Sequence, residues 1–261
     1  MVKYDYSGKT VIIYGGTTGI GRASAKAFAA AGAKVFVSGI GAAEGKSLVE
    51  EIRSAGNKDV EFIEADVTRD EDVRKAMDQA VARFGRIHCA FNNAGIPGPA
   101  APVQDMTETD FYRLIDVNLK GVFLGLKYQI PHMLEHGGGA IVNTASLFGE
   151  RAFPSTAVYC ATKHAVIGLT RSAAFEVARH GIRINALAPG PVNTILLHGM
   201  FGGEEAARHT VTKFVPQKRI SQPEEQAAVV LWLCSDAASF IVGHTLRADG
   251  GGFEASAVDQ V

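Results

Sequence analysis

The residues whose types and spacing suggest chemistry are Ser146, Tyr159 and Lys163. Tyr159 and Lys163 are four positions apart, and on a helix such residues lie one turn above the other on the same face. We therefore expect the Lys163 ammonium to lower the pKa of Tyr159 from about 10 towards neutrality. A charge about 4 Å away, at an effective dielectric constant of about 20, contributes the roughly 4 kcal/mol that such a shift requires. The three side chains predict proton transfer at a substrate oxygen, coupled to hydride transfer.

A glycine-rich turn near the N-terminus is a second, separate signal. Tyrosine and lysine four residues apart also occur by chance on amphipathic helices, so independent support for a functional site is needed. The apolar run at 11–13 is typical of a buried strand, the turn carries Gly15, Gly19 and Gly21, and residues 22–31 form an Ala-rich helical pattern. Glycines let the backbone approach a pyrophosphate, and a helix N-terminus offers it free N–H groups. An ordinary strand-to-helix turn is the alternative, but the order of elements favours a dinucleotide site.

Together these motifs resemble the short-chain dehydrogenase/reductase family. The matching segments, which follow the family order between residues 15 and 194, are GGTTGIG at 15–21, Asp66-Val67, NNAG at 92–95, VNLKG with Asn118, NTAS with Ser146, YCATK with Tyr159 and Lys163, and APGPVNT at 188–194. The resemblance implies the family fold, a single-domain doubly wound sheet of the Rossmann type, and a nicotinamide cofactor.

The resemblance also implies a role for each matched catalytic residue. Tyr159 is the expected general acid and base, Ser146 binds the substrate oxygen, and Lys163 also binds the ribose of the nicotinamide half. Asn118 matches the family's fourth catalytic residue, which holds a water in a proton relay; a solvated polar side chain is the alternative at this helical position. Thr194 matches the residue that meets the carboxamide, or else it caps the next helix.

The expected cofactor contacts come from the turns that follow the strands and from the catalytic helix. They are Gly15, Thr17, Thr18, Gly19, Ile20, Gly21, Gly39, Ile40, Asp66, Val67, Asn93, Ala94, Gly95, Tyr159, Lys163, Pro189, Gly190, Val192 and Thr194. One departure from the family pattern lies beside this turn: Tyr14 replaces the usual threonine, so the side-chain bond that braces the turn is absent or replaced.

Cofactor choice rests on a second departure from the family pattern. An aspartate at 39 would bind the ribose 2′-hydroxyl of NAD, and an arginine at 40 would pair with the 2′-phosphate of NADP, but the chain has Gly39 and Ile40. Thr18 also stands where some NADP enzymes of the family carry a basic residue. Arg22 and Lys46 are candidates to bind a 2′-phosphate, although both are also typical solvated helix residues. We expect NAD, with NADP or dual use as the alternative.

Strand and helix patterns alternate along the chain. Apolar strands are predicted at about 10–14, 34–38, 60–65, 87–92, 140–145, 184–188 and 245–249, each separated by room for a crossover helix. The sequence therefore predicts an α/β fold, with one domain over 1–261, about seven parallel strands and helices on both faces. A substrate-covering loop and helix is expected at about 191–215.

Composition excludes several other classes of protein. The 26 basic and 27 acidic residues leave no electrostatic footprint for nucleic acid or an anionic membrane. No apolar stretch is long enough to span a bilayer, and the first ten residues lack a signal-peptide core, so we expect a cytoplasmic protein. The three cysteines have no metal-site spacing and are expected to be reduced and mostly buried. The eight histidines form no metal motif, and we expect no metal.

The residues expected around the substrate are mostly apolar, which favours an apolar and perhaps cyclic secondary alcohol or ketone. They are Ser146, Leu147, Phe148, Phe153, Pro154, Tyr159, Ile195, Leu196, Leu197, Met200 and Phe201, although half of the apolar ones could merely pack the core. Glu150 and Arg151 could contact a polar substituent or lie solvated at the rim.

An NAD(P)-dependent alcohol dehydrogenase or ketone reductase is the favoured function. A cofactor-independent lyase of the same fold would have Arg in place of Lys163 and would lose the glycine turn. A non-catalytic nucleotide sensor is the third class, and a serine hydrolase is excluded because Ser146 lies outside a G-x-S-x-G elbow. The family resemblance implies a homo-oligomer, expected to be a tetramer, built partly on long helices at about 107–135 and 157–180. Their apolar residues Phe123, Leu124, Val166, Leu169 and Phe175 could serve either core or interface.

Overall fold

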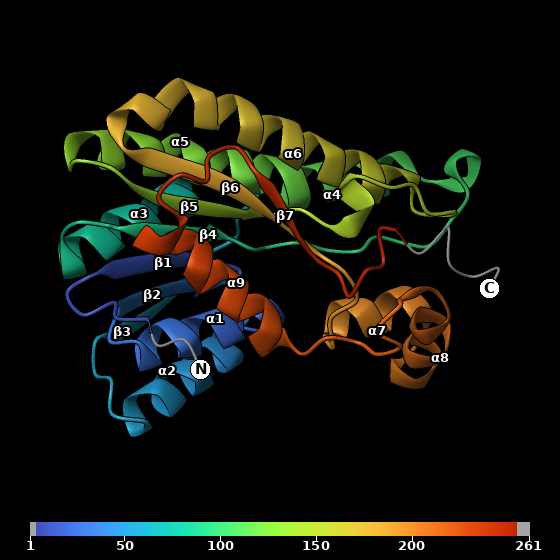
Figure 1. The fold of residues 1–261 in the computed structure, drawn as a ribbon, viewed down its shortest axis with the longest axis horizontal. Coiled ribbons are helices and arrows are strands. Elements are labelled where there is room, and N and C mark those ends of the chain that lie inside the picture. Colours follow the sequence, from blue (N-terminus) through green and yellow to red (C-terminus); the bar gives the residue numbers. More distant parts are fainter. Residues whose placement is uncertain (1–3, 255–261) are drawn as a thin grey trace.

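The computed structural model, described here for residues 4–254, has a central parallel sheet with helices on both faces (Figure 1). Residues 1–3 and 255–261 of the predicted domain lie outside the described residues. The strands are β1 (Thr10–Tyr14), β2 (Lys34–Gly39), β3 (Val60–Glu64), β4 (Cys89–Asn92), β5 (Gly139–Thr144), β6 (Ile182–Pro189) and β7 (Thr245–Ala248). They form one seven-stranded sheet in the order β3-β2-β1-β4-β5-β6-β7. The predicted doubly wound parallel sheet is therefore confirmed.

Two helical layers cover the sheet, as the upper and lower halves of Figure 1 show. One layer holds α1 (Gly19–Ala30), α2 (Ala42–Ser54) and α9 (Pro223–Cys234). The other holds α3 (Asp70–Phe84), α4 (Glu108–Ile115), α5 (Gly121–Glu135) and α6 (Ala157–Val177). A π-turn at Asp116–Lys120 joins α4 to α5, and a 3-10 turn, Ala178–His180, extends α6, so both predicted long helices are present. The first helix begins at Gly19 rather than at residue 22, because the glycine turn itself supplies its first turn.

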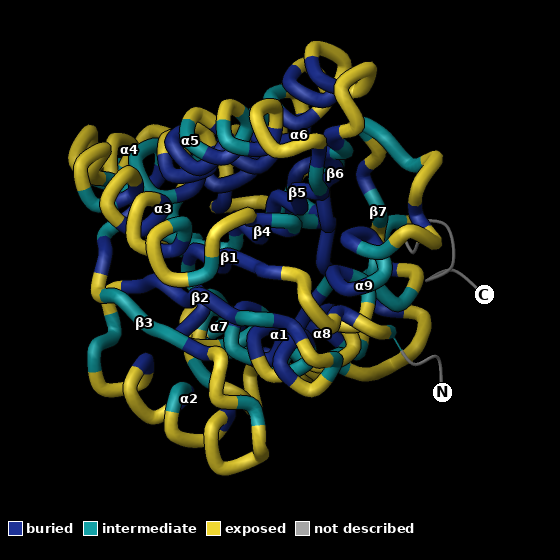
Figure 2. The backbone as a smooth tube through the Cα atoms, turned by 90° about the vertical axis from the view of Figure 1, so that its left-hand side faces the viewer, coloured by how far each residue is buried: buried dark blue, intermediate teal, exposed yellow. Residues whose placement is uncertain are grey.

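The central strands are apolar on both faces because each face meets its own helical layer. In β1, Ile12 and Tyr14 belong to the core cluster on the side of α3, α5 and α6, while Val11 and Ile13 belong to the cluster on the side of α1, α2 and α9. Figure 2 shows β1 mostly as a buried segment, and helices whose outer turns are exposed. The predicted start of β4 at residue 87 is wrong by two residues, since the Ile87 N–H bonds the His132 imidazole (3.0 Å) instead of a strand partner.

A buried polar cluster ties the middle of the sheet to α5 and α6. The Asn92 amide donates to Gln129 (3.0 Å) and to Asn143 (2.8 Å), Gln129 donates back to Asn92 (2.7 Å), and Asn143 donates to Thr170 (2.9 Å). All four side chains are buried. Since buried amides cost free energy unless they are paired, this closed set holds the ends of β4 and β5 in a defined position relative to the two helices.

Two further helices lie beyond the carboxyl ends of the strands, α7 (Ile195–Phe201) and α8 (Glu204–Phe214) (Figure 1). Gly202 and Gly203 join them, both with positive φ. The segment expected at about 191–215 thus contains two short helices. Within residues 4–254 no helix is long and apolar enough to cross a membrane. The three cysteines are buried and form no disulfide, as the sequence predicts.

Replacing Gln129 by leucine tests the buried polar cluster. The change leaves the Asn92 side chain without its reciprocal partner, so we expect the free energy of unfolding to fall by about 1–3 kcal/mol. For a protein of this size, each kcal/mol lowers Tm by about 2–4 °C. Calorimetry of the Gln129→Leu variant would measure the effect. The exposed Gln79 on α3 provides the matched control, Gln79→Leu, which should change the free energy by less than about 0.5 kcal/mol. Equal stabilities for the two variants would contradict this account.

Candidate active site

A cavity of about 960 Å³ lies at the carboxyl ends of the strands. It runs from Gly39, the last residue of β2, and Asp66, which follows β3, past the glycine turn to Ser146 and Tyr159, and ends among apolar residues of α7 and α8. This is the edge where ligands bind in open parallel sheets, because the turns there are free to carry polar groups.

The glycine turn at one side of this cavity packs very closely against the end of β4. Gly15 has φ +73°, and a Cβ on it would lie 2.5 Å from the Cα of Ala94. The Asn93 amide donates to the Gly15 carbonyl (2.8 Å) and accepts from the Thr144 hydroxyl (3.1 Å). Asn93 therefore braces the turn in place of the missing threonine. Tyr14 instead donates its buried hydroxyl to the Val73 carbonyl (3.0 Å), so its role is to pack α3 onto the sheet.

The N-terminus of α1 suits a negatively charged group. No side chain caps it, its first turn contains no acidic residue, and Gly19 and Ile20 line the cavity. Free N–H groups and the positive end of the helix dipole attract phosphate oxygens. Gly21 lines no part of the cavity, contrary to expectation. It is buried beneath the turn, where a Cβ would lie 2.2 Å from the Gly15 carbonyl oxygen, so it permits the close packing without facing the ligand.

All other residues expected to bind the cofactor do line the cavity. They are Gly15, Thr17, Thr18, Gly19, Ile20, Gly39, Ile40, Asp66, Val67, Asn93, Ala94, Gly95, Tyr159, Lys163, Pro189, Gly190, Val192 and Thr194. Thr194 also caps α7, since its hydroxyl accepts from the Leu197 N–H (3.3 Å). The capping alternative is therefore confirmed, and the contact with the carboxamide stays a prediction. The residues present thus fit an extended dinucleotide.

Ser146, Tyr159 and Lys163 meet in the cavity from two elements. Ser146 follows β5 and caps the 3-10 turn Leu147–Gly149, with its hydroxyl accepting from the Phe148 N–H (3.1 Å). Tyr159 and Lys163 lie on successive turns of α6, both buried. The Lys163 ammonium donates to the Thr144 carbonyl (2.9 Å) and lies 5.8 Å from the centroid of the Tyr159 ring. Ser146 and Tyr159 belong to different elements, and the packing of α6 against the end of β5 brings them together.

Burial governs the protonation of these groups. It raises the pKa of Tyr159 to about 12, an effect that the Ser146 hydroxyl partly offsets. It lowers the pKa of the Lys163 ammonium to about 8. The predicted lowering of the Tyr159 pKa by Lys163 is therefore not seen: the ammonium donates to the Thr144 carbonyl, and desolvation of the phenolate raises the pKa.

Asn118 lies beneath the site and not on the surface. Its side chain is fully buried within the π-turn, so the solvated alternative is wrong. Its amide oxygen accepts from the Ile96 N–H (2.8 Å), and its amide nitrogen donates to the Ile96 carbonyl (3.0 Å) and to Thr162 (3.3 Å). Asn118 thus holds the loop after β4 against α6. Its partner in this loop, Ile96, is two residues beyond Ala94, which packs against the glycine turn.

The far end of the cavity is apolar. As expected, it is lined by Leu147, Phe148, Ile195, Leu196, Leu197, Met200 and Phe201. Phe153 and Pro154 do not line it. Phe153 stacks behind Phe148, with ring centroids 5.0 Å apart, and so supports a wall that it does not form.

Glu150 and Arg151 contact neither end of the cavity, contrary to one of the two expectations for them. Glu150 pairs with Arg247 of β7 (2.7 Å). Arg151 donates to the carbonyls of Gly252 (2.6 Å) and Phe253 (2.9 Å). The two residues therefore fasten the loop after Ser146 to the end of the described chain.

Several lining residues were missed by sequence reasoning. They come from the loop after β4, from one face of α4 and the π-turn, and from α8: Ile96, Thr109, Tyr112, Arg113, Asp116, Val117, Val211 and Phe214. The spacing 109, 112, 113 and 116 is helical, which indicates one face but not what that face covers. Among residues 4–254 no group of three metal-ligating side chains gathers.

This fold and this site define a dinucleotide-dependent oxidoreductase, and three comparisons give its family. A sequence profile described as enoyl-(acyl carrier protein) reductase matches residues 15–252. The 2,5-dichloro-2,5-cyclohexadiene-1,4-diol dehydrogenase of Sphingobium indicum is 42% identical over 248 residues, covering 95% of this chain and 98% of the relative. The cyclohexanol dehydrogenase of an Acinetobacter species is 41% identical over 245 residues, covering 94% and 95%. The crystal structure of levodione reductase matches with a TM-score of 0.92 at 37% identity, covering 95% and 99%.

The chain therefore belongs to the short-chain dehydrogenase/reductase family. It is an oxidoreductase that transfers hydride between a nicotinamide cofactor and a secondary alcohol or ketone. A solved 3-ketoacyl-(acyl-carrier-protein) reductase of Brucella melitensis that is 32% identical to this chain is in complex with NADH, in keeping with a nicotinamide cofactor. The lyase and sensor alternatives find no support in these relatives.

The buried Lys163 ammonium should make stability depend on pH. In the unfolded chain lysine keeps its proton until about pH 10.4, whereas in the folded protein the pKa is about 8. Between these values the unfolded state binds more protons, so stability rises with pH. We expect the free energy of unfolding of the wild type, relative to Lys163→Met, to increase by about 3 kcal/mol from pH 7 to pH 10.5. Urea denaturation at both pH values would measure it, and a constant difference would show that the ammonium is not desolvated.

Proposed function

We propose that this enzyme interconverts an apolar, cyclic secondary alcohol and its ketone, with Tyr159 as general acid and base and NAD as the preferred cofactor. The observation that carries the proposal is that Ser146 and Tyr159 face a cavity whose adjoining end is formed by Phe148, Met200 and other apolar side chains. The relatives named for cyclohexanol and for a cyclohexadiene diol support the cyclic substrate. The same site runs oxidation or reduction according to the supply of cofactor.

The chain's own residues handle the proton. Tyr159 removes the hydroxyl proton of the alcohol during oxidation and returns it to the carbonyl oxygen during reduction. Ser146 donates a hydrogen bond to the same oxygen, which orients it and stabilises charge that develops there. When bound, the nicotinamide accepts or delivers the hydride and, in its oxidised form, carries a positive charge.

Lys163 contributes a positive charge near Tyr159 and hydrogen-bond donors for the ribose, and it does not itself transfer the proton. Its ammonium is buried within 5.8 Å of the Tyr159 ring, and its Thr144 contact leaves it two further donors for ribose hydroxyls. Because burial favours the neutral phenol, a second positive charge close to Tyr159 is needed to bring its pKa into the working range. Asn118 is a positioning residue in this scheme: its side chain is committed to Ile96 and Thr162, so any relay role belongs to other groups of the π-turn.

We also propose that α7 and α8 cover the substrate, and that the protein is a cytoplasmic homotetramer. The wall that these helices contribute, with Leu197, Met200 and Phe214, supports the first proposal. Of the apolar residues on the long helices, Leu124 and Val166 are buried in the core, whereas Phe123 and Phe175 are 49% and 75% exposed. The exposed pair supports an interface on α5 and α6.

The proposed reaction is tested first with NAD and a panel of alcohols. Absorbance at the nicotinamide band should show reduction of NAD with cyclohexanol-type and other apolar cyclic secondary alcohols. Their kcat/KM should exceed that of a linear alcohol bearing a charge by at least about a hundredfold, since a charged group left unpaired in an apolar wall costs several kcal/mol. Preference for a sugar or a phosphorylated alcohol would overturn the substrate class, and no reduction of NAD or NADP with any alcohol would overturn the reaction.

The role of Tyr159 is tested by the Tyr159→Phe variant. Loss of a general acid and base lowers kcat by about a hundredfold or more, whereas the affinity for NADH should stay within a few-fold because the ring remains. Steady-state kinetics and fluorescence titration measure the two quantities. Tyr128→Phe is the matched control, since Tyr128 lies on α5 and donates to Asp70 outside the cavity. A nearly normal kcat in Tyr159→Phe would remove this residue from proton transfer.

A further inference from the structure

We propose that Glu44 and Glu51 on α2 set the preference for NAD, in place of the aspartate that the end of β2 lacks. Glu44 supplies the carboxylate beside the ribose subsite, and Glu51 holds the neighbouring arginine away from it. The inference rests on the nicotinamide-dependent function proposed above and names the residues that discriminate between the two cofactors.

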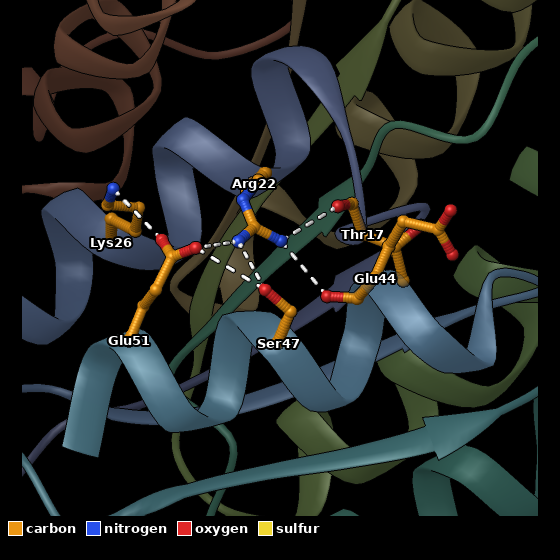
Figure 3. Close-up of polar contacts among 6 residues, drawn as sticks. All are labelled: Thr17, Arg22, Lys26, Glu44, Ser47 and Glu51. Carbon is orange, nitrogen blue, oxygen red and sulfur yellow. Dashed lines mark hydrogen bonds and ion pairs between the residues drawn. The ribbon is translucent and has the colours of Figure 1, made fainter. Parts of the chain in front are cut away.

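Glu44 lies beside the turn that follows β2. Gly39, the last residue of β2, and Ile40 line the cavity, whereas Glu44 lies just outside this lining, and α2 begins three residues after Gly39. A Cβ built on Gly41 would lie 2.7 Å from the Glu44 Oε2 atom and 3.4 Å from the Thr17 hydroxyl, so the carboxylate sits between the glycine turn and the start of α2. Figure 3 shows Glu44 next to Thr17 there. Among residues 4–254 its carboxylate has no hydrogen-bond or ion-pair partner.

An unpaired carboxylate in this position favours the binding of NAD over that of NADP. It accepts hydrogen bonds from ribose hydroxyls, which strengthens binding when both hydroxyls are free. A 2′-phosphate replaces one donor by a dianion, and the like charges repel each other. Glu44 therefore does from the first turn of α2 what an aspartate at position 39 would do from the strand.

Arg22 is the cation that a 2′-phosphate would otherwise use, and it is already occupied. One guanidinium nitrogen of Arg22 donates to the carbonyls of Thr17 (3.3 Å) and Glu44 (3.0 Å), and the other donates to Ser47 (3.4 Å) and to the Glu51 carboxylate. Lys26 pairs with the same carboxylate (3.2 Å). Figure 3 shows the guanidinium lying across α2 with all four contacts made. The expectation that Arg22 clamps a 2′-phosphate is therefore not supported.

The remaining cations lie elsewhere. Lys46 is two residues beyond Glu44, and residues two apart on a helix point to opposite sides, so Lys46 does not face the same turn. The lysine and arginine side chains that line the cavity are Arg113 on α4 and Lys163 on α6, both from the helical layer opposite α2. Among the described residues near the end of β2, the Glu44 carboxylate is thus unpaired, whereas the charge of Arg22 is neutralised by Glu51.

The test compares binding of ADP and of adenosine 2′,5′-bisphosphate to the full-length protein by calorimetry, because the second probe carries the 2′-phosphate. We expect the wild type to prefer ADP by at least about tenfold at low salt. Glu44→Gln should reduce this preference by about tenfold, and Glu44→Gln with Glu51→Gln should reduce it further by freeing Arg22. The preference should also shrink as salt rises, since an exposed carboxylate is screened. The same order is expected for the Kd values of NADH and NADPH.

Glu50→Gln is the matched control, because it removes one exposed carboxylate from the same helix without touching Arg22 or Gly41. It should leave the preference within about twofold. The Arg22→Gln variant tests whether Arg22 binds the 2′-phosphate or only holds the glycine turn through its contact with Thr17. We expect it to weaken both probes by a similar factor through the loss of its Thr17 contact, and selective loss of the bisphosphate would overturn the inference.

The remaining outcomes distinguish this inference from the function on which it rests. Tight binding of ADP with a preference that Glu44→Gln does not change would overturn the role of Glu44 and leave the hydride-transfer function standing. Binding of neither probe would overturn the proposed cofactor-dependent function itself. A wild type that prefers the bisphosphate would contradict the proposed NAD preference and the inference together.

Discussion

The close packing of the glycine turn against the end of β4 is the constraint on which the rest of the site depends. Gly15 approaches Ala94 so tightly that no side chain fits between them, and Asn93 bonds both the Gly15 carbonyl and Thr144. These contacts join the turn after β1, the turn after β4 and the end of β5 in one rigid unit. Because Lys163 donates to the Thr144 carbonyl, α6 is anchored to the same unit. The residues proposed to bind the dinucleotide and those proposed to transfer the proton are thus positioned by one set of bonds.

Burial by itself leaves the proposed proton-transfer groups unready for chemistry. The phenol of Tyr159 and the ammonium of Lys163 lie in a site where desolvation raises the first pKa to about 12 and lowers the second to about 8. Each group is pushed towards its neutral form, so neither is ready for chemistry through burial alone. In the proposed function the missing charge arrives with the oxidised nicotinamide, which couples readiness for proton removal to the presence of the hydride acceptor.

Much of the fold was predictable because apolar strands and glycine turns are local patterns. The seven strands and the two helical layers follow from periodicity, and the two long helices follow from the family resemblance. The structure shifts the ends of the elements by a few residues where a local bond competes, as at Ile87 with His132. The family motifs likewise placed most of the cavity wall. What failed was orientation: Phe153, Glu150 and Arg151 lie near the site in sequence, yet they face Phe148, Arg247 and the end of the described chain.

The sequence by itself determined the elements, their order and the catalytic residue types, since each depends on neighbours within a few positions. Tertiary structure alone decided which charges meet. Arg22 and Glu51 are 29 residues apart and belong to different helices, and only the packing of α1 beside α2 pairs them. The same holds for Ser146 beside Tyr159 and for the π-turn that buries Asn118 beneath Ile96. Electrostatic effects depend on distance and solvent exposure in three dimensions, and spacing along the chain specifies neither.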